Sequence, residues 1–347
     1  MGIDLGRGRI DLKCEQAKQR PWHYQATVSS KNLEVRTITA ASSGVYFGID
    51  ESPGGKQVYR TQEDGFFQPL GIYATAVAAV SEQEVLFGGP PSSGAAYSVI
   101  QRSSDGGLTA AVVSSLSPFV SKVHEIFQVG SATYLASTSS GGIWRSTDAG
   151  KNWNLTMTIS PAYHVRRFYR PSENCVWAAT GYDSPAAANG AYIWQSEDGG
   201  ISWSLKHTVI ASGDFAVQGI FGVDADTFLI STTGASVNEL GVYRSRYDSA
   251  NSYSWIRVLD QIGFSELVHT DSGHLLFGFQ QEFTLSGGTS YRSLDQGSSW
   301  FEDSRIAKRG NVRLMQNDDG TVEAFTARIL AGSRTDRHRN FEPDRIN

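Results

Sequence analysis

One eight-residue pattern, Ser-x-Asp-x-Gly-x-x-Trp, recurs along this chain and limits the folds that it can adopt. The pattern is complete at three places, which begin at Ser146, Ser196 and Ser293. A fourth copy begins at Ser103 and keeps the Ser, Asp and Gly, but it has Ala110 in place of the Trp. A pattern of this specificity that returns about every 40–50 residues indicates an array of similar units that bury their faces against one another.

The residue types in the pattern predict a tight turn between two strands. The Ser hydroxyl and the Asp carboxylate can bond backbone N–H groups of their own turn, the Gly can adopt a positive φ, and the Trp begins the next strand. We therefore assign a structural role to Ser103, Asp105, Gly107, Ser146, Asp148, Gly150, Trp153, Ser196, Asp198, Gly200, Trp203, Ser293, Asp295, Gly297 and Trp300.

Three weaker copies extend the array toward both ends of the chain. They begin at Thr61, Ser245 and Arg334; the copy at Ser245 is stretched, and the last copy keeps an Asp and the aromatic residue Phe341. Successive copies begin 41 to 50 residues apart. Seven units of this size account for residues 21–347, which we interpret as one domain.

The fourth unit indicates what each unit contains. Four short segments that are apolar or alternate in polarity follow one another in it: His164–Arg170, Cys175–Thr180, Tyr192–Ser196 and Trp203–Val209. Four antiparallel strands per unit, repeated radially, form the blade of a β-propeller. The sequence therefore predicts an all-β fold, a seven-bladed β-propeller of four-stranded antiparallel blades.

The other units follow the same plan. The expected innermost strands are Leu33–Ala40, Ala74–Val80, Lys122–Val129, His164–Arg170, Phe215–Val223, Glu266–Thr270 and Val312–Gln316. The second strands are expected to begin near Val45, Val85, Tyr134, Val176, Phe228, Leu275 and Val322.

The repeated turn resembles the Asp-box (BNR) repeat of sialidases, sortilin-type receptors, xyloglucanases and the photosystem II assembly factors of the Ycf48 type. The resemblance extends over about residues 22–347 and implies the propeller fold. It does not imply one function, because the Asp box in that superfamily lies at the blade periphery, away from the site. The sialidase signature Phe/Tyr-Arg-Ile-Pro is missing: the first innermost strand carries Arg36 without it, and Tyr169-Arg170-Pro171 lacks the Ile.

The two ends of the chain suggest how the ring closes. Residues 1–20 precede the repeats, and we predict an extended N-terminal arm that is either disordered in isolation or ordered by lying on a neighbouring molecule. Residues 22–28 resemble the strand after each repeated turn and could pair with the last blade; residues 340–346 are the alternative, and both segments could pair there. Residues 1–20 also lack the apolar segment of a secretory signal, which favours synthesis in the cytoplasm and leaves the final location unknown, a virion included.

Charge and composition disfavour several kinds of partner. The net charge is −5, and the sequence contains no run of Lys and Arg of the kind that binds along a phosphate backbone, so nonspecific nucleic-acid binding is disfavoured. No segment approaches the length of a membrane span, and the seven His show no metal-ligand spacing. Cys14 and Cys175 lie far apart in sequence and are expected to be free thiols. We therefore predict no cofactor, no metal, no nucleic-acid readout and no membrane insertion.

One position in the innermost strands is rich in hydrogen-bond donors. It is the residue after a Val, and it gives five candidates for an anion site in the central channel: Arg36, His124, Arg166, His269 and Arg313. Side chains that point inward from this position would suit an anion, a carboxylate ligand or an acidic loop of a partner. The alternative is that they face the seams between blades or a solvated rim.

These observations favour a non-catalytic, protein-binding scaffold that is a subunit of a larger assembly, with the N-terminal arm as a tether. A phage virion or tail is one setting for such a subunit, by analogy with propellers in those structures. The alternatives are a sialidase-like glycoside hydrolase or a glycan-binding lectin, and an assembly factor of the photosystem II type.

Overall fold

The protein is all-β in its computed structural model. The part of the chain that the structure describes contains no α-helix and one three-residue 3-10 turn, η2 (Ser139–Gly141). The structure describes residues 5–10, 33–41, 44–51, 55–61, 67–92, 95–116, 120, 122–159, 164–181, 191–210, 215–223, 227–234, 241–247, 253–260, 264–269, 275–279, 290–303, 311–316 and 322–327.

Six groups of four antiparallel strands follow one another along the chain, and we number them as blades 1 to 6. Blades 4 and 5 belong to one eight-stranded sheet because Gly181 of one pairs with Ala216 of the other.

Blade 1 contains β2 (Leu33–Ala41), β3 (Gly44–Glu51), β4 (Gly55–Thr61) and β5 (Phe67–Tyr73). Blade 2 contains β6 (Ala76–Ala79), β7 (Val85–Gly89), β8 (Val99–Ser103) and β9 (Ala111–Ser115). Blade 3 contains β10 (Val123–Gln128), β11 (Tyr134–Thr138), β12 (Gly142–Ser146) and β13 (Asn154–Thr158). Blade 4 contains β14 (His164–Tyr169), β15 (Val176–Gly181), β16 (Ala191–Ser196) and β17 (Ser204–Ile210). Blade 5 contains β18 (Phe215–Gly222), β19 (Phe228–Gly234), β20 (Gly241–Tyr247) and β21 (Tyr253–Leu259). Blade 6 contains β22 (Phe264–His269), β23 (Leu275–Phe279), β24 (Ser290–Ser293) and β25 (Phe301–Asp303).

The two ends of the chain meet in a three-stranded sheet, which we call the terminal sheet. Its order is β26 (Asn311–Gln316), β27 (Val322–Ala327) and β1 (Leu5–Ile10), and Leu5 pairs with Ala327. Six residues of the predicted N-terminal arm therefore lie in a sheet. The predicted closing segments 22–28 and 340–346 lie outside the described residues, so the boundary at residue 20 and the count of seven complete blades stay predictions.

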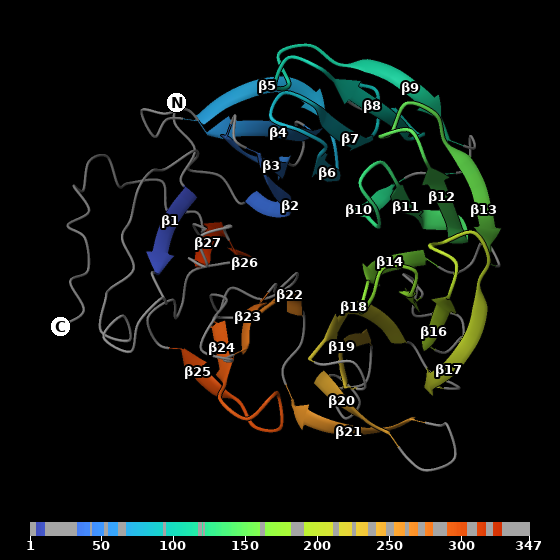
Figure 1. Cartoon of the computed structure of the whole chain (residues 1–347). Coiled ribbons are helices and arrows are strands. Elements are labelled where there is room, and N and C mark those ends of the chain that lie inside the picture. Colours follow the sequence, from blue (N-terminus) through green and yellow to red (C-terminus); the bar gives the residue numbers. More distant parts are fainter. Residues whose placement is uncertain are drawn as a thin grey trace, which may run out of the picture.

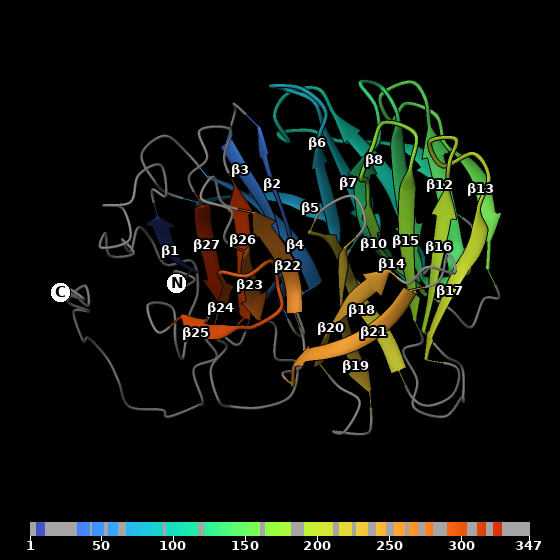
Figure 2. The ribbon, with the colours of Figure 1, turned by 60° about the horizontal axis from the view of Figure 1, so that its bottom comes forward.

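The blades form a closed ring around a common axis (Figure 1). Each innermost strand contacts the innermost strand of the next blade, in the order β2, β6, β10, β14, β18, β22 and β26, and β26 contacts β2 again. The fourth strands, such as β9, β13 and β17, lie at the periphery (Figure 1). In the tilted view of Figure 2 the blades stand side by side around the ring.

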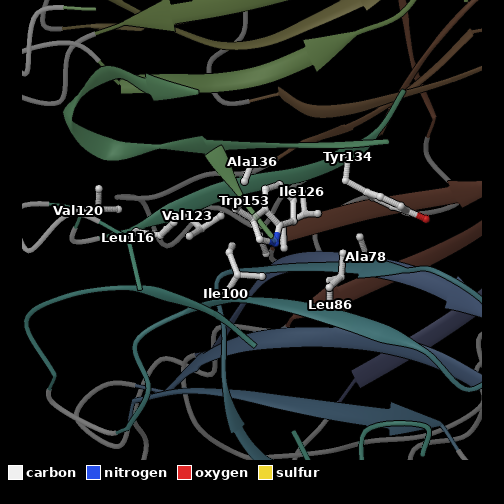
Figure 3. Close-up of a cluster of buried hydrophobic side chains, with 11 residues drawn as sticks. Ala78, Leu86, Ile100, Leu116, Val120, Val123, Ile126, Tyr134, Ala136 and Trp153 are labelled. Carbon is white, nitrogen blue, oxygen red and sulfur yellow. The ribbon is translucent and has the colours of Figure 1, made fainter. Parts of the chain in front are cut away.

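The hydrophobic core is divided among the seams between neighbouring blades. Leu86 and Ile100 of blade 2 pack against Val123, Ile126 and Trp153 of blade 3 in one such seam (Figure 3). Similar clusters fill the seams from blade 1 to blade 6. Because blades 2 to 5 are each buried by a neighbour on both sides, their innermost strands are held firmly at the axis.

Four copies of the repeated turn share one hydrogen-bond pattern, and we call them the repeat turns (residues 103–110, 146–153, 196–203 and 293–300). In the third, the Ser196 hydroxyl donates to Asp198 Oδ1 at 2.7 Å and accepts from the Gly200 N–H at 2.8 Å. Asp198 also accepts from the Ser202 N–H at 2.9 Å and from the Ser202 hydroxyl at 2.6 Å. The predicted glycine has φ of 81° to 89° in all four turns. Equivalent bonds join Ser103 to Asp105, Ser146 to Asp148, Ser293 to Asp295, and the hydroxyls of these serines to Gly107, Gly150 and Gly297.

The aromatic residue of the repeat turn adds a bond in two copies. Trp153 Nε1 donates to the Gly150 carbonyl at 3.0 Å, and Trp300 Nε1 donates to the Gly297 carbonyl at 3.1 Å. Trp203 Nε1 is buried and makes no hydrogen bond among the described residues.

The repeat turns also join neighbouring blades, a feature that the sequence analysis did not predict. Arg145 of β12 in blade 3 donates from Nε to the Gly199 carbonyl in the turn of blade 4 at 2.9 Å. The matching bonds run from Arg60 to the Gly106 carbonyl at 2.8 Å and from Arg244 to the Gln296 carbonyl at 3.1 Å. Each of these arginines directly precedes the first position of its own repeat. The repeat turns, which share one geometry within this chain, thus also form contacts between blades.

The predicted starts of the second strands are confirmed to within one residue, whereas the innermost strand β6 begins two residues after its predicted start and β22 two residues before it. The second strands β7, β11, β15, β19, β23 and β27 begin at the predicted residues, and β3 begins one residue earlier. Cys175 is a free thiol, and Cys14 lies outside the described residues. Within the described segments, no helix has the length and apolar character needed to span a membrane.

Candidate functional site

Five of the innermost strands carry a β-bulge near their first residues. Pairing with the second strand skips one residue in each of β2, β10, β14, β18 and β22. A bulge inserts an extra residue, bends the strand and changes the direction of that side chain. The skipped residues are Arg36, His124, Arg166, Gln218 and Ser265.

Three of the five predicted channel residues occupy these bulges, and two do not. Arg36, His124 and Arg166 are the bulged residues of β2, β10 and β14. His269 is the last residue of β22 and pairs with Leu275, whereas the bulge of that strand is at its other end. Arg313 pairs in regular register with Phe325. The structure brings His124 and Arg166 together, because β10 and β14 are neighbours at the axis.

A group of basic side chains surrounds this pair, and we call it the basic cluster: Lys122, His124, His164, Arg166 and Arg167. All five are half-buried. His124 Nε2 and His164 Nδ1 lie 3.2 Å apart in a hydrogen bond that crosses the seam between blades 3 and 4. The ring centroids are 5.4 Å apart and the rings are tilted by 56°.

The surroundings keep both imidazoles neutral. Burial lowers the pKa of His124 well below its usual range, and the charges of Arg166 and other cations lower it further. Burial, followed by the charges of Arg166 and Lys122, lowers the pKa of His164 to about 4. The hydrogen bond between the rings is consistent with this, because it needs at least one nitrogen without a proton.

Glu125 is the single carboxylate in the sequences of β10 and β14. Arg167 Nη1 donates to its Oε1 at 3.0 Å, and the Phe168 N–H donates to its Oε2 at 2.7 Å. Both oxygens of Glu125 are thus occupied by donors from blade 4. This carboxylate neutralises part of the charge of Arg167 and leaves the cluster with a positive excess.

The turn η2 between β11 and β12 lies against the start of the same strands. The Ser139 N–H donates to the Lys122 carbonyl at 3.0 Å, and the Lys122 N–H donates to the Ser139 hydroxyl at 3.0 Å. Ser140 has φ of 72°, a conformation that non-glycine residues seldom adopt. Strain of this kind persists where the surrounding contacts fix it, and it often occurs at binding sites.

Sequence reasoning found His124 and Arg166 but missed Lys122, His164 and Arg167. A usable signal was present: Lys122-Val123-His124 and His164-Val165-Arg166 both place a basic residue on each side of a Val. The proximity of these basic residues across the seam could not be predicted without knowing the relative register of β10 and β14.

No group of three or more His, Cys, Asp or Glu side chains that could hold a metal ion occurs among the described residues. The basic cluster has donors suited to an anion and has no set of metal ligands.

Comparison with known proteins identifies the fold. No protein-family model matches the sequence, and no curated protein matches it. Solved structures of propellers do match it. The structure of YCF48 bound to D1 peptide aligns with a TM-score of 0.58 at 14% identity and covers 86% of this chain and 94% of that chain.

Two further solved structures belong to other propeller families. The GH74 enzyme of Niastella koreensis aligns with a TM-score of 0.55 at 16% identity, over 86% of this chain and 46% of that chain. The WD40 β-propeller domain of Doa1 aligns with a TM-score of 0.51 at 13% identity, over 87% of this chain and 96% of that chain. The chain has the β-propeller fold. At these identities the similarity is one of fold alone.

Proposed function

We propose that this chain is a non-catalytic, protein-binding propeller of the Asp-box type, and that it recognises an acidic segment of a partner at the basic cluster. The observation that carries the proposal is the gathering of Lys122, Arg166 and Arg167 with two imidazoles at the axis of a protein whose net charge is −5. A local positive site on a negative protein attracts acidic groups to that place and repels them elsewhere.

The comparisons support a role in protein binding. One similar structure is a propeller, YCF48, bound to a D1 peptide, and this chain covers 94% of its length. For this chain, an extended acidic segment of a partner protein would suit the half-buried cations of the basic cluster. We place the chain in a larger assembly, as an assembly factor or as a virion or tail subunit. The part of the N-terminal arm that follows Ile10 is its candidate tether.

The second candidate function, glycoside hydrolysis, follows from the similarity to a GH74 enzyme. Hydrolysis with two carboxylates needs one as acid and one as base or nucleophile, on either side of the scissile bond. Glu125 accepts hydrogen bonds from Arg167 and from the Phe168 N–H, which stabilise it as a carboxylate anion. The basic cluster is therefore better suited to binding than to this chemistry.

The test uses the purified full-length chain as bait with its native host extract, followed by cross-linking and mass spectrometry. The axial variant is Lys122→Glu with Arg166→Glu. The matched control, called the rim variant, is Lys151→Glu with Lys206→Glu. It changes the charge by the same amount at two exposed positions, one in the repeat turn of blade 3 and one in β17 of blade 4. We expect a partner that cross-links through an acidic segment, that salt releases, and that the axial variant alone loses.

Two results would overturn the proposal. One is a partner retained equally by the axial and the rim variants. The other is release of reducing ends from xyloglucan or a sialoside by the wild-type chain, with that activity lost when a carboxylate is replaced.

A further inference from the structure

The hydrogen bond between His124 and His164 gives the basic cluster a property beyond simple attraction of charge. We propose that the seam between blades 3 and 4 is an oxyanion site that takes up one proton from solvent as a carboxylate of the acidic segment binds. This inference rests on the proposed function, because the carboxylate is assigned to that partner.

The proton inventory of the pair is fixed by its geometry. Two neutral imidazoles hold two N–H protons, and one of them lies in the hydrogen bond between His124 Nε2 and His164 Nδ1. The two outer nitrogens, His124 Nδ1 and His164 Nε2, therefore share one proton, so one is a donor and the other an acceptor. One proton added from water makes both outer nitrogens donors, and it leaves the bond between the rings intact.

This change is unfavourable without a ligand because the two imidazoles are shielded from water and their neighbours are mainly cationic. The strands that contact β10 and β14 at the axis, β6, β7, β15 and β18, carry no charged residue in their sequences, and neither does η2. The other strands that contact β10 or β14 are β11 and β12. Apart from the two imidazoles, the titratable residues of these four strands and of the position before β10 are Lys122, Glu125, Tyr134, Arg145, Arg166, Arg167 and Tyr169.

Most of these groups already have a defined role. Glu125 is engaged by Arg167, Tyr134 donates to the Ala79 carbonyl, and Arg145 donates to the Gly199 carbonyl. Lys122 and Arg166 are the cations that act on both imidazoles. A bound carboxylate places a negative charge among them, offsets their repulsion and accepts a hydrogen bond from the pair.

The size of the effect follows from proton linkage. The free pair stays neutral to acid pH, since the pKa of His164 is about 4. An anion that restores an ordinary imidazole pKa near ~6.5 makes binding about tenfold tighter at pH ~5.5 than at pH ~7.5, with uptake of about one proton at the lower pH. A site without this linkage binds a fully ionised ligand equally at both pH values.

The experiment measures the affinity of the full-length chain for a capped hexa-aspartate peptide by calorimetry at both pH values. Two buffers of different ionisation enthalpy give the number of protons taken up. A capped hexa-asparagine peptide is the uncharged control. The variants His124→Gln and His164→Gln each remove the pair. The control variant is His207→Gln, which removes an imidazole of β17 outside the basic cluster; the ring of His207 stacks on that of Trp177, with 6.1 Å between the ring centroids.

We expect tighter binding at the lower pH with proton uptake in the wild-type chain and in His207→Gln, and loss of both in His124→Gln and His164→Gln. The proton count in the wild-type chain needs no variant, so a variant that fails to fold does not remove the test. Tight, salt-sensitive binding of the peptide without proton uptake overturns the inference and leaves the proposed function in place.

Sulfate, which does not titrate in this range, provides the second arm. Sulfate binding with proton uptake, in a chain that does not bind the peptide, supports the oxyanion site and overturns the acidic segment as its ligand. If neither probe binds, both the inference and the proposed function are overturned.

Discussion

Gly199 and Gly200 are consecutive residues of one repeat turn, and they offer a direct test of its role between blades. Both have positive φ, +67° and +89°. A Cβ on Gly199 would meet nothing closer than Arg145 Nη2 at 4.0 Å, whereas a Cβ on Gly200 would lie 2.6 Å from Leu135 Cδ2 of blade 3. The two alanine variants therefore share the backbone strain and differ in the contact with the neighbouring blade.

The expected magnitudes follow from these two terms. Gly199→Ala adds left-handed strain of roughly 1 kcal/mol, which the fold already accepts at Ala149 and Gln296, where φ is 58° and 56°. Gly200→Ala adds the same strain and forces the fully buried Leu135 to move, for a total of about 2–5 kcal/mol. We expect the midpoint of thermal unfolding to fall by roughly 2 °C for Gly199→Ala and by several times that for Gly200→Ala.

The assay is thermal unfolding at a fixed scan rate, with pulse proteolysis as a second measure because unfolding of a chain of this length is often irreversible. The double variant Gly200→Ala with Leu135→Ala should be less destabilised than the sum of its parts by about 1–2 kcal/mol, because the clash is removed. Equal effects of the two glycine variants, or additivity in the double variant, would refute the contact between blades as the cause.

Three other predictions concern the same turns. Burial raises the pKa of Asp198, but the hydrogen bonds that its carboxylate accepts together outweigh burial and lower the pKa to about 2. The contribution of Asp198 to stability is therefore complete above the unfolded value near ~3.9 and is lost between about pH 4 and pH 2. Asp198→Asn should flatten this part of the curve of unfolding midpoint against pH. Arg145→Met should destabilise by about 1–2 kcal/mol because it leaves the Gly199 carbonyl of the next blade without its donor, and denaturant unfolding measures the loss. Trp153→Phe should cost about 1 kcal/mol more than Trp203→Phe, since Trp153 donates a hydrogen bond that Trp203 does not make, and equal losses would contradict this.

The strands were predictable from the sequence because their signals are local. An apolar run after a turn marks the start of β11 at Tyr134 and of β15 at Val176, and the burial of all residues in both strands explains why the run is continuous. The repeat turns were predictable for the same reason, since their hydrogen bonds join residues within four positions of one another.

The parts that escaped prediction depend on contacts between distant segments. The strand β1 has the sequence Leu-Gly-Arg-Gly-Arg-Ile, whose glycines weaken any local tendency to extend. It forms a strand because it pairs with β27 at the other end of the chain. The bonds from Arg60 and Arg145 to the next repeat turn likewise join residues 46 and 54 positions apart, so no short pattern contains both partners.

The candidate site was found in part because the bulge has a sequence correlate. In β10, β14 and β18 the residue before the bulge is a Val that is fully buried in a seam, and the bulged residue follows it. In β22 the residue before the bulge is Phe264, so choosing the residue after a Val selected His269 instead of the bulged residue Ser265.

The same arrangement explains how a binding site can change without harm to the fold. Val123 and Val165 are buried at 0% exposure and hold β10 and β14 in their seams. The bulge directs the next side chain away from the regular pleat, so its charge has little effect on the packing of the Val. Blades 3 and 4 add a basic residue before each Val, and these two strands are neighbours. Basic residues therefore accumulate at one of the described seams, and this asymmetry makes the seam between blades 3 and 4 the candidate site.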